Sequence, residues 1–138
     1  MNILQYVRNR IIIARLKKRY YKHHYKMWDF ITVHIMQDSS ESLKDSHYID
    51  DLKDNYVQHS ALQKDMPLYN NCYLCTLYYG TVSIRAGYRG CPLYNAQGMP
   101  CSSTDSWYQA VHNDLLTRKE RTEYAGKIRD CVLKERRK

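Results

Sequence analysis

Four of the five cysteines lie within thirty positions of the chain, between residues 72 and 101. Cys72 and Cys75 form a Cys-x2-Cys pair, and Cys91 and Cys101 follow at longer intervals. Zinc prefers tetrahedral sites with thiolate ligands, and a pair at this spacing is typical of such sites. Glycine and proline residues beside the two later cysteines place both of them on turns. The sequence therefore predicts one structural zinc ion held by these four thiolates.

Other interpretations of the cysteines stay open at this point. Free or redox-active thiols are the main alternative, and disulfides would need an oxidising compartment. A further alternative is a mixed site in which His112 replaces one of the four thiolate ligands. Cys131 lies thirty residues downstream at an apolar position of a predicted helix, and we interpret it as a packed thiol.

The need for a metal fits the small size and unusual core of the protein. The chain has 138 residues, which indicates one domain, and it contains fourteen tyrosines but a single phenylalanine. A tyrosine hydroxyl needs a partner or water when the ring is buried. A small core of this kind would benefit from a metal ion whose binding is coupled to folding.

Charge is distributed in blocks along the chain. Residues 29–117 hold five bases and ten acids, whereas residues 118–138 hold nine bases and four acids. Residues 1–28 hold no acid and eight bases: Arg8, Arg10, Arg15, Lys17, Lys18, Arg19, Lys22 and Lys26. Two basic ends that flank an acidic centre indicate a surface that faces nucleic acid or a membrane.

The first segment, residues 2–36, is predicted to be one long amphipathic helix. It lacks glycine and proline. Its apolar stripe recurs at helical spacing and is interrupted by Lys18 and Thr32; its members are Ile3, Val7, Ile11, Ala14, Tyr21, Tyr25, Trp28 and Ile35. Three interpretations of its basic half compete: a nucleic-acid surface, a membrane surface, and a helix that packs on the protein and shows water its bases.

A second helix is predicted over residues 43–64, with a capping box formed by Ser42 and Asp45 and an inner stripe of Ile49, Leu52, Tyr56 and His59. Residues 38–65 carry seven acids and three bases. An acidic helix after a basic one indicates an antiparallel hairpin that neutralises part of the basic surface internally.

The remaining segments complete a mainly α fold with a small zinc-stapled β insert. Residues 77–84 are rich in strand formers around a glycine, which predicts a short hairpin between the cysteine pairs. Helices are expected over residues 105–116 and 118–136, the latter opened by a capping box from Thr117 to Glu120. We therefore divide one domain into a helical hairpin (1–66), a zinc-binding loop (67–104) and C-terminal helices (105–138).

These motifs resemble those of a group of small tailed-phage proteins that are described as hypothetical or zinc-binding. The shared residues are Cys72-x2-Cys75, Gly90-Cys91-Pro92-Leu93, Gly98, Cys101, Trp107-Tyr108, and Ala125 and Ile128 in a following helix. The family often has a further cysteine just before its Cys-Pro, a position held here by Tyr88 or a neighbour. The resemblance implies a phage accessory protein in the host cytoplasm, and such proteins often bind host machinery or counter host defences.

The functional expectation is binding without catalysis. The chain has no G-x-S-x-G, no phosphate-binding glycine loop and no zinc-deaminase signature. The run of residues 11–14 is too short to span a bilayer, and no signal-peptide cleavage pattern follows it, so we expect a soluble, cytoplasmic protein. The expected partner is a host protein, and nucleic acid bound through the basic helix and the C-terminal tail is the alternative. A cysteine-based redox or hydrolytic enzyme is a third hypothesis.

Overall fold

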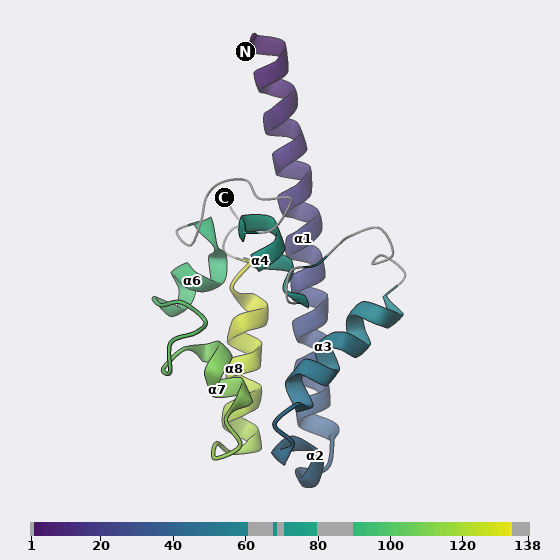
Figure 1. The fold of residues 1–138 in the computed structure, drawn as a ribbon, viewed down its shortest axis with the longest axis vertical. Helices are drawn as coiled ribbons and strands as arrows, with labels where there is room; N and C mark the ends of the chain where they lie inside the picture. Colours follow the sequence, from purple (N-terminus) through teal and green to yellow (C-terminus); the bar gives the residue numbers. More distant parts are fainter. Residues whose placement is uncertain (1, 61–67, 69–70, 80–89, 134–138) are drawn as a thin grey trace.

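The computed structural model describes residues 2–60, 68, 71–79 and 90–133, and no strand occurs among them. The described elements are α1 (Ile3–Gln37), α2 (Ser40–Lys44), α3 (Tyr48–His59), α4 (Tyr73–Tyr79), α6 (Pro92–Gln97), α7 (Trp107–His112) and α8 (Arg118–Asp130). Figure 1 shows α1 running the length of the molecule, with the other helices gathered around its C-terminal half. The prediction of a mainly helical protein is confirmed.

Helix α1 is continuous over 35 residues, as predicted. The side chain of Asn2 caps its N-terminus by accepting a hydrogen bond from the Gln5 amide at 2.8 Å. At its other end the Asp38 amide donates to the carbonyl of His34. Without glycine or proline in between, nothing in the sequence interrupts the helix.

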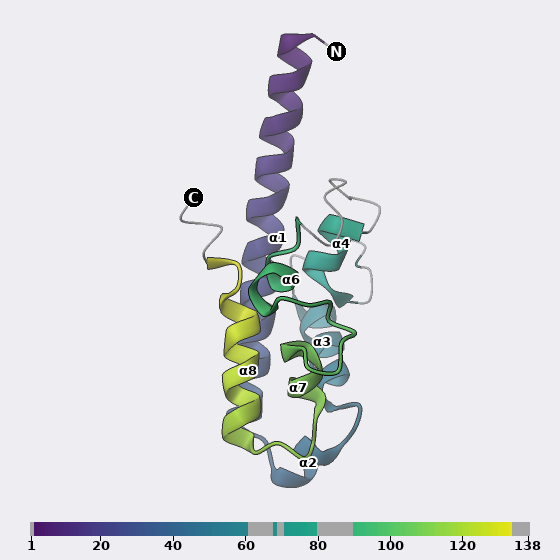
Figure 2. The same ribbon diagram turned by 90° about the vertical axis from the view of Figure 1, so that its left-hand side faces the viewer.

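Helix α8 lies antiparallel along the C-terminal half of α1 (Figure 2). Near the start of α8, Arg118 donates a hydrogen bond to the Ile35 carbonyl at 2.8 Å. Near its end, the carbonyl of Ile128 accepts one from His24 at 2.7 Å. Helices α3 and α4 cover other sides of α1, and α7 packs against α8. The elements thus surround the part of α1 that follows residue 19.

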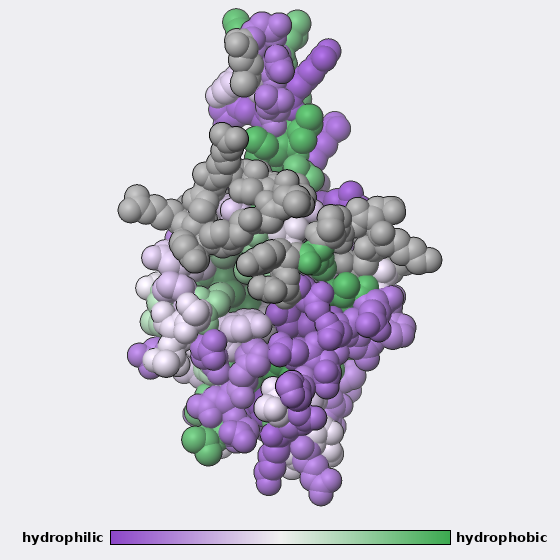
Figure 3. Space-filling view, viewed as in Figure 1, coloured by the Kyte–Doolittle hydropathy of each residue, from purple (hydrophilic) through white to green (hydrophobic). Residues whose placement is uncertain are grey.

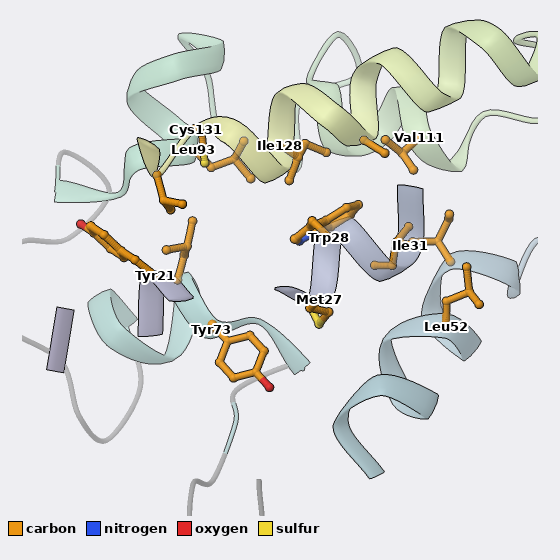
Figure 4. Packing of buried hydrophobic residues seen from close by; sticks show 14 of the residues in the cluster. Tyr21, Met27, Trp28, Ile31, Leu52, Tyr73, Leu93, Val111, Ile128 and Cys131 are labelled. Carbon is orange, nitrogen blue, oxygen red and sulfur yellow. The ribbon is translucent and has the colours of Figure 1, made fainter. Parts of the chain in front are cut away.

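The core forms where these helices meet, and it includes residues from each of the three predicted segments. Ile31, Val111 and Ile128 are completely inaccessible to solvent. Figure 4 shows Trp28 and Ile31 of α1 facing Ile128 and Val111 across the core. Burying an aliphatic side chain of this size contributes about 2 kcal/mol, so this junction of α1, α7 and α8 stabilises the fold.

Several buried polar groups in the core have hydrogen-bond partners, as the tyrosine-rich composition requires. The hydroxyls of Tyr21 and Tyr78 hydrogen-bond to each other, and Tyr48 donates to Asp38 at 2.6 Å. The guanidinium of Arg121 is buried and donates to two carbonyls, at 2.8 Å and 2.6 Å, which belong to Val111 and Leu43. Arg121 therefore joins α8 to α7 and α2.

The prediction of one helix over residues 43–64 is wrong, because the helical segment starts earlier and is divided in two. Two helices, α2 and α3, occupy the described part, and residues 61–64 lie outside it. The cap is Ser39, which accepts from the Ser42 amide, and Asp45 ends α2. Ile49 and Leu52 are buried as expected, Tyr56 is half-buried, and His59 is exposed.

The β-hairpin expected over residues 77–84 is not shown. Leu77 and Tyr78 belong to α4, and residues 80–84 lie outside the described part of the chain. Tyr73, Leu74, Leu77 and Tyr78 are all buried, at spacings that fit one face of a helix rather than the alternation of a strand. Contact with α1 therefore favours the helix over the strand propensity of these residues.

The C-terminal helices are shorter than predicted: α7 begins two residues later than expected, and α8 begins at the predicted residue. α7 is capped by Ser106, and the capping box from Thr117 to Glu120 opens α8. α8 ends at Asp130, and residues 134–136 of the predicted helix lie outside the described residues. Cys131 is a packed thiol, as predicted.

Candidate functional site

The first cysteine pair is built on the N-terminus of α4. Cys72 lies just before the helix, and its carbonyl accepts a hydrogen bond from the Thr76 amide at 2.9 Å. Its sulfur accepts one from the Cys75 amide at 3.1 Å. Cys75 itself lies in the first turn of α4. The positive end of the helix dipole and the amide N–H group both favour a thiolate at Cys72.

The other two cysteines flank α6. Cys91 is the residue before this helix, and Pro92 occupies its first position. The chain leaves α6 through Gly98, whose φ of 76° is in the left-handed region that favours glycine. It then reaches Cys101, whose sulfur accepts a hydrogen bond from the Gln97 side chain at 3.3 Å. The turns predicted at both cysteines are therefore present.

The four thiols influence one another electrostatically. The pKa of Cys72 is lowered, chiefly because its sulfur accepts a hydrogen bond from the Cys75 thiol, with smaller help from the Lys53 charge. The pKa of Cys75 is raised, because its thiol donates that hydrogen bond and is buried, and the charges of Cys91 and Cys101 add to the effect. Burial raises the pKa of Cys91 to about 11. The four thiols thus lie within electrostatic range of each other.

We name Cys72, Cys75, Cys91 and Cys101 together the thiol cluster. Among the described residues, no group of three or more His, Cys, Asp or Glu side chains is arranged as a metal-binding site. The fold brings the four predicted ligands within electrostatic range of one another, but not into an arrangement around one common point. Four thiolates form a common structural shell for zinc, so residues of this type are suited to that ion.

The polar contacts of His112 are with residues outside the thiol cluster. Its Nδ1 contacts the Tyr108 carbonyl at 2.8 Å, and its Nε2 lies 3.6 Å from the Asp50 carboxylate. These contacts account for both ring nitrogens, so the structure gives no support to His112 as a replacement ligand.

A buried lysine, Lys53, borders the thiol cluster, and the sequence patterns did not predict it. Its side chain is 5% exposed and donates a hydrogen bond to the Tyr108 hydroxyl at 3.0 Å. Burial alone would lower the pKa of Lys53, but nearby Tyr108 and Cys72 reverse this, and the net pKa is raised. Its ammonium group therefore places positive charge beside the thiols.

A second missed feature is the contact between His24 of α1 and the end of α8. The Nε2 atom of His24 lies 2.7 Å from the Ile128 carbonyl and 3.5 Å from the Cys131 sulfur. Because a carbonyl only accepts, Nε2 carries the proton. Burial lowers the pKa of His24 to about 4. The ring is therefore neutral at pH 7 and serves as a link between the two helices.

The basic part of α1 extends beyond the body of the protein. We call residues 2–19 the arm; its side chains are exposed except for Leu16 and Lys17, which are half-buried. Ile3, Leu4 and Ile12 are 81%, 71% and 53% exposed. Figure 3 shows hydrophobic and hydrophilic side chains together at the free end of the arm. The interpretation of this segment as a helix packed against the protein is therefore wrong for the arm.

The predicted neutralisation of the bases by the acidic helix is not observed. α3 lies beside the C-terminal part of α1, where the rings of Phe30 and Tyr56 are 5.7 Å apart. Within the described part of the chain, the ion pairs involve His34, His112 and Arg129. None involves the eight predicted binding bases: Arg8, Arg10, Arg15, Lys17, Lys18, Arg19, Lys22 and Lys26.

Five of these bases form a line on the outer side of α1. At about 100° per residue, Arg8, Arg15, Arg19, Lys22 and Lys26 fall within about 60° of one another around the helix, on the side away from the buried Ile31 face. The line extends over about 27 Å along the helix axis. We call these five residues the outer line.

No described helix is long and apolar enough to cross a membrane. Comparisons of the chain with protein-family models, with curated proteins and with solved structures give no match.

Proposed function

We propose that this protein is a non-catalytic binding protein that holds a protein partner on its arm. The observation that carries this proposal is the exposure of the arm's apolar side chains, on a helix whose other half forms the core. Exposed apolar residues that lie together mark interaction sites in soluble proteins. The resemblance to small phage proteins would make the partner a host protein, in host takeover or in counter-defence.

Photo-crosslinking tests this proposal on the complete protein. A photoreactive phenylalanine derivative replaces Tyr6, an exposed aromatic residue of the arm, and in a matched control it replaces the exposed Leu115 of the body. In a bacterial lysate we expect protein adducts from position 6 that resist nuclease and are absent from position 115. Equal labelling from both positions would contradict the proposal.

We propose further that the thiol cluster holds one structural zinc ion. The donor chemistry supports this, and so does the hydrogen bond from the Cys75 amide to the Cys72 sulfur, because it favours a thiolate at Cys72. The ammonium group of Lys53 would offset part of the negative charge that four thiolates leave around the ion. Zinc bound there would join α4 to α6 and so complete the body that supports the arm.

Native mass spectrometry of the untagged protein tests the zinc proposal. We expect one zinc ion in the wild type, lost when Cys72→Ser removes a ligand or when a chelator is added. Cys131→Ser is the matched control, because it removes a buried thiol outside the thiol cluster. The absence of zinc from the wild type, or its loss in the control variant, would contradict the assignment.

The outer line favours a second candidate function, the binding of nucleic acid. Five bases without an ion pair among the described residues would neutralise phosphates along one strand. Such binding is independent of sequence and weakens steeply with salt. Replacing Arg15, Arg19 and Lys22 with alanine should then abolish binding of a fluorescent single-stranded oligonucleotide, and nucleic-acid adducts from position 6 would favour this function over the first.

A further inference from the structure

A stripe with a seven-residue pattern, with Leu4 in the place of Ile3, runs along α1 through both the arm and the body, and on a straight α-helix it drifts by about 20° per heptad. From Leu4 to Ile35 its positions alternate between spacings of three and four, which is the heptad pattern of helices that pack side by side. The ten positions are Leu4, Val7, Ile11, Ala14, Lys18, Tyr21, Tyr25, Trp28, Thr32 and Ile35. They correspond to alternating a and d positions, and only Lys18 carries a charge.

The lower half of this stripe is covered within the protein. Tyr21, Trp28 and Ile35 are buried. On the same side, the guanidinium of Arg129 in α8 lies 5.5 Å from the centre of the Tyr25 ring. α8 thus serves as the packing partner for the stripe along the body, and the helix ends at Asp130.

The upper half of the stripe is left open where α8 has ended (Figure 2). We call Leu4, Val7, Ile11 and Ala14 the seam. All four are exposed, with Val7 and Ile11 each at 45%. The seam spans about two heptads, or roughly 15 Å from Leu4 to Ala14. At about 100° per residue, the four residues of the seam fall within about 80° of one another around the helix, on a face displaced from the buried one that includes Ile31.

Basic residues flank the seam on both sides. With Leu4 at position a, Arg8 and Arg15 occupy e positions, and Arg10 and Lys17 occupy g positions. Charges at e and g select the partner of a helix pair. A second copy of the arm would bring like charges together in either orientation, so self-pairing is disfavoured.

We propose that the seam binds an amphipathic helix of a partner protein that carries apolar residues at its own a and d positions and Asp or Glu at its e and g positions. This inference rests on the proposed protein-binding function and names the chemistry of the partner. Apolar contact with the seam supplies attraction, and the four flanking bases supply selectivity. Because all four are basic, the charge match holds for parallel and antiparallel pairing alike.

Designed peptides test the proposal with the full-length protein. The probe is a fluorescent three-heptad peptide with Leu or Ile at a and d and Glu at e and g, and its binding is followed by fluorescence anisotropy. We expect saturable binding in the micromolar range. Two peptides serve as controls: one with Lys at e and g, and one with the same Glu positions but Ser at a and d. Both should bind at least tenfold more weakly.

Two neighbouring isoleucines provide matched variants of the protein. Ile11 belongs to the seam, whereas Ile12 lies about 100° away, and their exposures are similar at 45% and 53%. Ile11→Asp should weaken binding of the acidic peptide more than tenfold, and Ile12→Asp should weaken it less than threefold. A double variant, Arg8→Glu with Arg15→Glu, should shift preference toward the Lys peptide. Circular dichroism verifies that each variant keeps its helix.

The outcomes separate this inference from the proposed function. If Ile11→Asp and Ile12→Asp weaken binding of the acidic peptide equally, the attraction is by charge alone and the inference is overturned. Equal affinity for the peptides with Ser and with Leu at a and d would overturn it for the same reason. Tighter binding to vesicles of anionic phospholipid than to the acidic peptide would also overturn it. Protein adducts from position 6 without peptide binding would leave the proposed function standing and the inference refuted. If neither protein adducts from position 6 nor peptide binding is found, the proposed function and the inference are both refuted.

Discussion

Acidification should destabilise the protein through His24. Burial lowers the pKa of this ring to about 4 in the folded state, whereas its ordinary value is 6.5. The unfolded chain therefore takes up the proton first as pH falls, so the stabilisation is present above about pH 6.5 and is lost progressively toward pH 4. For these two values the free energy of unfolding falls by about 2 to 3 kcal/mol between pH 7 and pH 4.5.

Urea titrations followed by tryptophan fluorescence measure this change, because Trp28 is buried next to the His24 ring. The variant His24→Gln keeps an N–H donor for the Ile128 carbonyl but does not titrate. We expect the wild type to lose about 2 to 3 kcal/mol more than this variant between the two pH values. The exposed His47→Gln is the control and should retain the wild-type dependence. Identical pH dependence in the wild type and His24→Gln would refute the reasoning.

Three further predictions concern stability, each measured as the midpoint and slope of urea unfolding. Arg121→Ala leaves two buried carbonyls without their donor and should cost about 3 kcal/mol, whereas Lys119→Ala at an exposed site should be neutral. Ile128→Ala opens a cavity in the core and should also cost about 3 kcal/mol, whereas Leu115→Ala, at a site that is 89% exposed, should change little. Thr117→Ala removes the capping box of α8 and should cost about 1 kcal/mol; a smaller effect than Leu115→Ala would contradict it.

Local patterns predicted the beginnings of several helices because their causes are local. The 35-residue α1 follows from periodicity without a helix breaker, and α8 starts at Thr117 because the capping box satisfies two backbone donors. The same reasoning failed at α2, where Ser39 rather than Ser42 is the cap. Both serines precede possible helical turns, and the sequence does not show the tertiary contacts of this segment, in which Leu43 is buried and its carbonyl accepts a hydrogen bond from Arg121.

The candidate sites were predictable in their residue types but not in their surroundings. The spacing of the cysteines predicts a shared site for the four residues of the thiol cluster, which stays a prediction, and nothing in the sequence places the charged side chain of Lys53 in the interior beside them. The apolar stripe of α1 predicted a surface that packs against other residues. It did not show which part of the stripe is covered by other helices of the same protein. An amphipathic pattern has the same spacing whether its apolar face is buried in a core or contacts another molecule. The exposed Ile11 and the buried Trp28 therefore both appear in the sequence as members of one apolar stripe.

The uninterrupted backbone of α1 means that the arm and the core share one rotational phase. Each residue turns the helix by about 100° and advances it by about 1.5 Å, and no glycine or proline provides a hinge. Each side chain of the arm is thus held at a fixed angle around the helix axis and a fixed distance along it from the body. One alanine inserted between Leu16 and Tyr20 would swing the seam a quarter turn or slightly more, while preserving every residue that lines it.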